Sequence, residues 1–129
     1  MLYEFRSDEL SSLNQMQAQF DALLAQYKEE DFALTCTLVG DRPCASEVDA
    51  SVMQAMKARA DAASLRYFGE AITYSSGSTD CNIPLFHGIP SLCVGCCFGG
   101  GAHTRQEYVE VSSLSHGLGF CLELLLAHF

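Results

Sequence analysis

The sequence predicts an α/β protein, because the spacing of its apolar residues switches between two periods along the chain. Apolar residues recur every three or four positions in three stretches: residues 8–27, 46–67 and 113–128. Shorter stretches alternate between apolar and polar residues or run apolar over a few positions: residues 2–6, 32–39, 71–74 and 91–95. The first spacing is typical of helices and the second of strands, so three long helices and four strands are expected.

The first predicted strand, residues 2–6, places Tyr3 and Phe5 on one face and Glu4 and Arg6 on the other. Ser7 follows at a position where its hydroxyl group can cap the helix over residues 8–27. After that helix, residues 32–39 return to period two, and the turn at residues 40–43 ends them. These residues predict a strand–helix–strand unit.

The second half of the chain begins with a helix that we expect to start at Ser46 and to end near Gly69. Residues 71–74 predict a brief strand that enters a polar loop, and residues 91–95 predict a buried strand. Ser112 or Ser113 is expected to cap the last helix. Gly117 and Gly119 lower its helix propensity, which indicates close packing of that helix against a sheet.

Composition limits the size of the protein and the kind of partner. A chain of 129 residues with 49% hydrophobic residues is long enough for one modest core. Its formal charge of −9 excludes binding to nucleic acids or anionic membranes, because both would repel it. No apolar run reaches membrane-spanning length and the first residues do not resemble a signal peptide, so a cytoplasmic location is expected. The seven cysteines are expected to be reduced thiols rather than a disulfide framework.

The residues whose types suggest a functional site rather than a packed core lie between positions 76 and 107. Four polar residues crowd a loop that leads into a short predicted helix: Ser78, Thr79, Asp80 and Asn82. Gly88 and Pro90 then interrupt the chain before the apolar residues 91–95. Hydroxyl and carboxylate groups at such a position can cap backbone N–H groups or contact a ligand.

A run of three glycines follows the predicted strand and leads to a histidine. Gly99, Gly100 and Gly101 can adopt backbone conformations closed to other residues and approach a ligand closely. The run delivers His103, which is followed by Thr104 and Glu107. A histidine at such a turn is a candidate metal ligand or general acid–base group.

These motifs resemble the C-terminal part of the two-zinc metallopeptidase family in both order and spacing. The resemblance rests on S-T-D-x-N at residues 78–82, G-I-P at 88–90, the glycine turn at 99–101 and H-T-x-x-E at 103–107. The family includes tripeptidase T, aminoacylase, acetylornithine deacetylase, succinyl-diaminopimelate desuccinylase and carboxypeptidase-G-type enzymes. An R-S pair after the first predicted strand and a G-x-R-P turn at residues 40–43 resemble the second half of the family's lid domain.

The resemblance implies a domain division and a set of site residues. Residues 1–43 would form half of a lid domain and residues 44–129 the C-terminal part of a catalytic domain. His103 would be the last zinc ligand, and Ser78, Thr79 and Asp80 would hold the adjacent loop and orient the histidine. Asp80 could instead bind metal directly.

The resemblance also implies residues that contact the substrate, a peptide or an N-acyl amino acid. These are Arg6, Asn82, Gly99, Gly100 and Gly101. Arg6 would reach the substrate carboxylate, often across a dimer; the alternative is a solvated arginine at a strand end. The family's lid domain usually dimerises. We expect a homodimer on this ground and because partial domains leave apolar faces uncovered.

Most of the catalytic apparatus of that family is missing from these residues. The family's amide hydrolysis uses two zinc ions, an H-x-D pair, a bridging aspartate, a Glu-Glu pair that supplies the general base, and a further carboxylate. No histidine here is followed two positions later by aspartate, and Glu29-Glu30 lies at a predicted helix end. No catalytic residue is therefore assigned. The expected function is that of a part or truncated relative of a zinc peptidase or amidohydrolase, inactive alone; the alternative is a non-catalytic module for dimerisation or small-ligand binding.

Three further patterns in the sequence could indicate a binding site but also have structural explanations. Cys93, Cys96 and Cys97 form C-x-x-C-C, which could hold zinc or an iron–sulfur centre with Cys81 or His103, or could fill a core. The glycine turn lacks the lysine that a phosphate-binding loop requires. The remaining histidines are expected to be structural or surface residues: His87, His116 and His128.

Overall fold

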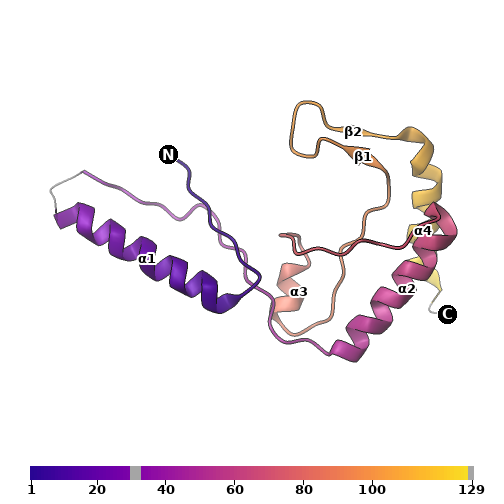
Figure 1. Cartoon of the computed structure of the whole chain (residues 1–129), viewed down its shortest axis with the longest axis horizontal. Helices are drawn as coiled ribbons and strands as arrows, with labels where there is room; N and C mark the ends of the chain where they lie inside the picture. Colours follow the sequence, from indigo (N-terminus) through magenta and orange to yellow (C-terminus); the bar gives the residue numbers. More distant parts are fainter. Residues whose placement is uncertain (30–32, 128–129) are drawn as a thin grey trace. The chain divides into compact units, whose positions relative to one another are not determined.

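The computed structural model describes residues 1–29 and 33–127 of the chain. Within these residues the chain has four α-helices: α1 (Leu10–Glu29), α2 (Ala50–Phe68), α3 (Asn82–Phe86) and α4 (Leu114–Leu126) (Figure 1). A 3-10 turn, η1 (Val111–Ser113), precedes α4, and two short strands pair antiparallel: β1 (Gly99–Gly100) and β2 (Tyr108–Val109). The protein is therefore a small mixed chain of helices and one sheet, compatible with the predicted α/β class.

The predicted helices are present with shifted ends. Helix α2 begins at Ala50 because Asp49, rather than Ser46, caps it: Asp49 Oδ1 accepts hydrogen bonds from the backbone N–H groups of Ser51 and Val52 at 2.8 and 3.1 Å. The helix ends at Phe68, and Gly69 caps it with a φ of 79° that few other residues adopt. Ser46 instead donates from its hydroxyl group to the carbonyl oxygen of Leu85 at 2.9 Å.

The prediction that a serine side chain caps the last helix is wrong. Ser113 occupies the N-cap position of α4 but makes no capping hydrogen bond with its side chain. Its buried hydroxyl group donates to the carbonyl oxygen of Glu110 at 2.7 Å and accepts from the N–H group of Phe98 at 2.9 Å. Ser113 therefore joins the segment before β1 to the start of α4. The predicted end of this helix includes His128, which lies outside the described residues.

The four predicted strands are wrong. Among the described residues of segments 2–6, 32–39, 71–74 and 91–95 none belongs to a strand, and Phe32 lies outside the described residues. Alternating apolar residues show only that a segment could lie half-buried in a sheet, whereas a strand also needs a hydrogen-bonded neighbour. Leu2, Leu38 and Val39 remain 81, 78 and 78% exposed, so no buried face forms there. Helix α1 is the one part of the predicted strand–helix–strand unit that the described residues contain.

The chain forms two compact units: Met1–Val48 with Ser76–Ile89, and Asp49–Ser75 with Pro90–Phe129. In the first unit, the ring of Tyr3 stacks on Phe20 of α1 at 5.5 Å, and Phe5 lies 6.3 Å from the same ring. The buried thiol of Cys44 donates to the carbonyl oxygen of Asp8 at 3.0 Å. The predicted domain boundary after residue 43 stays a prediction.

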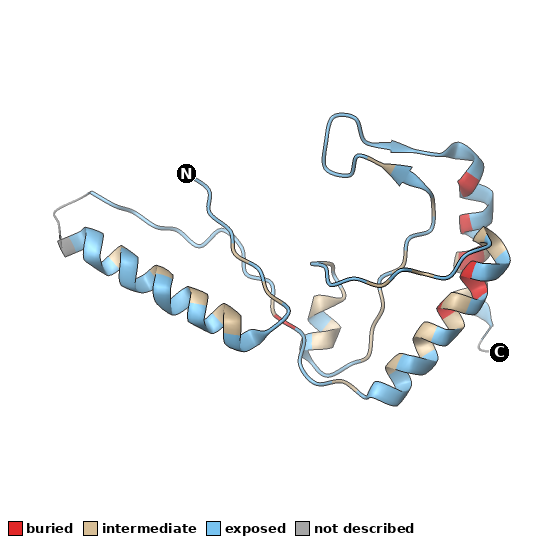
Figure 2. Ribbon diagram, in the orientation of Figure 1, coloured by how far each residue is buried: buried red, intermediate tan, exposed pale blue. Residues whose placement is uncertain are grey.

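The second unit is built on the packing of α2 against α4, where most of the buried residues lie (Figure 2). Phe120 of α4 is 1% exposed and contacts Phe68 of α2, whose ring also lies 5.1 Å from Phe98. Arg59 of α2 donates to the carbonyl oxygens of Glu123 and Leu124 near the C-terminal end of α4. An arginine at that position offsets the negative end of the helix dipole.

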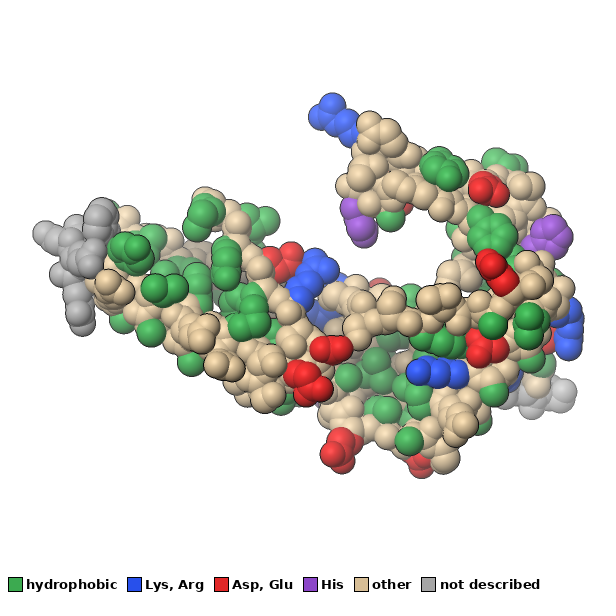
Figure 3. Space-filling view, viewed as in Figure 1, with side chains coloured by type: hydrophobic (Ala, Val, Ile, Leu, Met, Phe, Trp, Pro, Cys, Tyr) green, Lys and Arg blue, Asp and Glu red, His purple; other side chains and the backbone are tan. Residues whose placement is uncertain are grey.

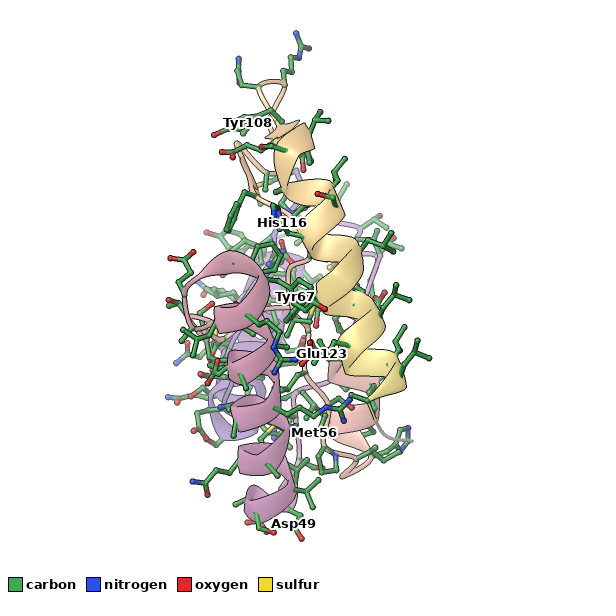
Figure 4. All side chains as sticks on the ribbon, turned by 90° about the vertical axis from the view of Figure 1, so that its right-hand side faces the viewer. Asp49, Met56, Tyr67, Tyr108, His116 and Glu123 are labelled. Atoms are coloured by element: carbon green, nitrogen blue, oxygen red, sulfur yellow. The ribbon has the colours of Figure 1, made fainter. Side chains whose placement is uncertain are left out.

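Close packing at the two glycines of α4 is confirmed, although neither packs on a sheet. A Cβ at Gly117 would collide with the carbonyl oxygen of Cys96, and a Cβ at Gly119 would collide with the ring of Tyr67. Tyr67 and Glu123 lie between α2 and α4 in Figure 4, where Glu123 also pairs with Arg66 at 2.7 Å. The glycines therefore let the helix approach its neighbours, as the sequence predicts.

Large apolar side chains remain exposed in both units. Helix α4 carries an exposed stripe of Leu114, Leu118, Leu122 and Leu125, and helix α1 exposes Leu10, Leu23 and Tyr27. Figure 3 shows hydrophobic side chains on the visible surface around α1. None of the helices in residues 1–29 and 33–127 combines the length and apolar character needed to cross a membrane.

Candidate functional site

The candidate site of the second unit is the hairpin of β1 and β2, whose connecting turn carries His103. Gly99 pairs with Val109 and Gly100 with Tyr108. A Cβ at Gly99 would collide with the carbonyl oxygen of Tyr108, and one at Gly100 would lie 2.9 Å from the ring of Tyr108. The backbone of the opposite strand therefore leaves no room for a side chain at Gly99, whereas Gly100 faces the side chain of Tyr108. Their predicted contact with a substrate stays a prediction.

The turn itself has an unusual backbone conformation at two positions. Gly101 has a φ of 68°, and His103 has a φ of 64°, the only positive φ at a non-glycine position among the described residues. Such a conformation is uncommon for residues with a side chain and is often found at functional turns. His103 is exposed, so its imidazole ring is accessible.

Local hydrogen bonds hold this turn. The backbone N–H group of His103 donates to Glu107 Oε2 at 3.2 Å, and the hydroxyl group of Thr104 donates to the carbonyl oxygen of Gly101 at 2.6 Å. The backbone N–H of Glu107 donates in turn to the carbonyl oxygen of Thr104 at 3.3 Å. The H-T-x-x-E motif is thus a self-contained turn in which Thr104 and Glu107 fix the backbone that carries His103.

The polar loop at residues 78–82 belongs to the first unit and is likewise held by its own side chains. The N–H group of Thr79 donates to Asn82 Oδ1 at 2.9 Å, and the N–H group of Cys81 donates to the hydroxyl group of Thr79 at 3.3 Å. Asn82 Nδ2 donates to the carbonyl oxygen of Pro43 at 3.1 Å. Asn82 therefore ties this loop to the turn at residues 40–43.

Arg42, in the turn at residues 40–43, contacts this loop and was not identified from the sequence. Its Nη1 atom donates to Ser78 Oγ at 3.1 Å, and its Nη2 atom lies 3.9 Å from Asp80 Oδ1. The sequence marks residues 40–43 only as a turn and carries no signal of a partner 36 residues later. The Asp80 side chain is fully exposed, so the pair with Arg42 adds little stability.

Arg6 is exposed and paired within its own segment. Its Nε atom lies 2.7 Å from Glu4 Oε1. This hydrogen bond lowers the pKa of Glu4 and raises the pKa of Arg6. The predicted contact of Arg6 with a substrate carboxylate stays a prediction.

The predicted site residues therefore fall into two groups. Arg6, Ser78, Thr79, Asp80 and Asn82 belong to the first unit, whereas Gly99, Gly100, Gly101 and His103 belong to the second. Within residues 1–29 and 33–127, no group of three or more His, Cys, Asp or Glu side chains is arranged to hold a metal ion. The described residues alone do not fit a zinc centre, because a catalytic zinc takes three protein ligands.

In the part of the chain that the structure describes, neither His87, His116 nor the cysteines of C-x-x-C-C belong to such a centre. The ring of His87 packs edge-on against Phe86 at 5.3 Å, His116 is exposed on α4 (Figure 4), and His128 lies outside the described residues. Cys93 and Cys96 are exposed and Cys97 is half-buried, whereas Cys81 belongs to the first unit.

No protein-family model matches this chain, and no significant match was found among curated proteins or solved structures.

Proposed function

We propose that this chain supplies the last metal-binding histidine, His103, to a two-zinc peptidase or amidohydrolase that cleaves peptide or N-acyl amide bonds. The observation that carries the proposal is the ordered set of motifs from Ser78 to Glu107. Each motif is short, but the order and spacing of all four resemble those in the C-terminal part of that family. The remaining metal ligands and the general base would come from polypeptide outside these 129 residues.

The conformation of the turn supports this role for His103. A metal ligand must be accessible and its backbone must be fixed, since a displaced ligand loses metal affinity. His103 is exposed at the tip of the β1–β2 hairpin, and Glu107 accepts a hydrogen bond from its backbone N–H group. One imidazole does not hold zinc tightly, so the isolated chain is expected to be inactive.

The proposal is tested by the zinc content of the polypeptide encoded by the complete reading frame. We expect an H-x-D motif upstream and, after gel filtration, two bound zinc ions, as the resemblance implies. His103→Ala should lower the zinc content, whereas His116→Ala, which changes an exposed histidine on α4, should leave it unchanged. Absence of zinc from the parent protein, or full zinc retention by His103→Ala, would contradict the proposal.

A second candidate function is favoured by the exposed apolar side chains. A contiguous apolar surface on a soluble protein often marks a site of association. The leucine stripe of α4 and the apolar residues of α1 are therefore consistent with a non-catalytic dimerisation or small-ligand-binding module. A reading frame that starts at Met1 and lacks an H-x-D motif would favour this candidate over the enzyme.

A further inference from the structure

Two cysteines from separate segments of the second unit meet at helix α4. The backbone of Cys96 packs directly on Gly117, where a Cβ would lie 2.8 Å from the carbonyl carbon of Cys96. Residues four positions apart in a helix share one face, so Cys121 lies on the same face one turn after Gly117. The absence of a side chain at Gly117 therefore lets the Cys96 segment approach the face of α4 that carries Cys121.

The Cys96 and Cys121 side chains are neighbours in the second unit. Burial raises the pKa of Cys121, and the neighbouring thiol of Cys96 raises it further. Cys96 is exposed, whereas Cys121 is half-buried. The thiol of Cys96 is therefore open to reagents from solvent, whereas that of Cys121 is partly covered.

We propose that Cys96 and Cys121 form a reversible oxidation site, at which a low-molecular-weight disulfide such as glutathione disulfide converts the two thiols into one intramolecular disulfide. This inference is independent of the proposed zinc hydrolase.

The reaction proceeds by two exchanges. The thiolate of Cys96 attacks one sulfur of glutathione disulfide, which gives a mixed disulfide and releases one glutathione thiolate. The thiolate of Cys121 then attacks the Cys96 sulfur and releases the second glutathione thiolate. The two protons lost by the cysteines pass to the two released thiolates, so two protein thiols are oxidised and one glutathione disulfide is reduced.

A disulfide between Cys96 and Cys121 would restrain the β1–β2 hairpin. Strand β1 begins three residues after Cys96, and the segment between them is already joined to the start of α4 through Phe98 and Ser113. A Cys96–Cys121 bond would add a second attachment between this segment and α4. Oxidation would therefore fix the base of the hairpin that carries His103.

Oxidation with glutathione disulfide followed by peptide mapping tests the proposal on the full chain. Trypsin cleaves after Arg66 and Arg105, so a Cys96–Cys121 bond joins the peptides 67–105 and 106–129. We expect this joined peptide in the dilute, oxidised protein and its loss on reduction. It should fall by about tenfold or more in Cys96→Ser and in Cys121→Ala.

Matched controls distinguish this pair from the neighbouring thiols. Cys93→Ser and Cys97→Ser should leave the yield of the joined peptide within about twofold of the parent chain, since neither thiol takes part in the exchange. Helix content by circular dichroism checks that each variant folds. The proposal is overturned if the joined peptide persists in Cys96→Ser, if only intermolecular bonds form, or if no bond to peptide 106–129 appears.

Discussion

The backbone carbonyl group of Cys96 lies directly against Gly117 of α4, and a side chain at position 117 has no room there. We expect Gly117→Ala to destabilise the protein. Alanine favours a helix over glycine by roughly 1 kcal/mol. Overpacking against backbone atoms, which cannot rotate away, costs about 1–3 kcal/mol.

The cost of overpacking should exceed the gain in helix propensity. We expect a net loss of up to about 2 kcal/mol in the free energy of unfolding measured with urea. Gly95→Ala is the control, because a Cβ at that position meets nothing within 4 Å. Equal or higher stability of Gly117→Ala would show that the Cys96 segment does not pack on α4.

The cap of helix α2 predicts a dependence of stability on pH. Hydrogen bonds from the hydroxyl group of Ser51 and from the backbone N–H groups of Val52 and Ser51 lower the pKa of Asp49 below its ordinary value of 3.8. A carboxylate with a lowered pKa in the folded state contributes stability above its unfolded pKa, and this stability is lost as the pH falls through the folded value.

Asp49→Asn isolates this contribution, since asparagine caps helices but does not titrate. Urea unfolding at neutral and acidic pH should show a smaller loss of stability on acidification in Asp49→Asn than in the parent chain. Identical acid dependence of the two proteins would contradict the assignment of Asp49 as the cap.

The hydrogen bond from the backbone N–H group of His103 to Glu107 should protect this amide proton from exchange with solvent. Glu107→Ala removes the acceptor for the backbone N–H group of His103, so the amide proton of His103 should exchange faster with solvent. Glu107→Gln keeps an uncharged acceptor and should give intermediate exchange, because hydrogen bonds to charged groups are about twice as strong as neutral ones. Unchanged exchange in Glu107→Ala, measured by NMR, would show that the carboxylate does not hold the turn.

Self-association is expected from the exposed apolar residues of both units. Light scattering at rising protein concentration should show a homodimer. Replacing Leu118 and Leu122 on the exposed stripe of α4 with lysine should weaken association if that stripe forms the contact, whereas Glu9→Lys, at an exposed polar position, should not. A monodisperse monomer at high concentration would contradict the expectation.

The helices could be predicted from the sequence because their information is local. The spacing of apolar residues located α1, α2 and α4 within a few positions, and the polar residues after Ser76 indicated the short α3. Helix hydrogen bonds join residues four apart, so one stretch of sequence carries most of what defines the element. The ends were less accurate, because Ser46 and Asp49 are both good caps. The contact of Ser46 with Leu85 joins positions 39 apart, and no local pattern indicates it.

The strands could not be predicted in this way, because a strand depends on a partner elsewhere in the chain. Residues 2–6 and 91–95 have suitable patterns but no described pairing, whereas the unpatterned Gly99 and Gly100 do pair with β2. Parts of the candidate site could likewise be predicted from the sequence and parts could not. The turn that carries His103 was located from its own residues, but the contacts of Arg42 with Ser78 and of Cys96 with α4 join distant positions and leave no local signal.

Hydrolysis of a panel of tripeptides and N-acyl amino acids tests the central claim most directly, namely that His103 belongs to a hydrolase site completed by polypeptide outside this chain. The assay compares the 129-residue chain with the polypeptide of the complete reading frame, each with zinc, cobalt or manganese and each with its His103→Ala variant. We predict no turnover by the chain alone, and turnover by the longer polypeptide that falls by about 100-fold or more in His103→Ala. Turnover by the chain alone that is lost in His103→Ala, or turnover by the longer polypeptide that His103→Ala leaves unchanged, would contradict the account.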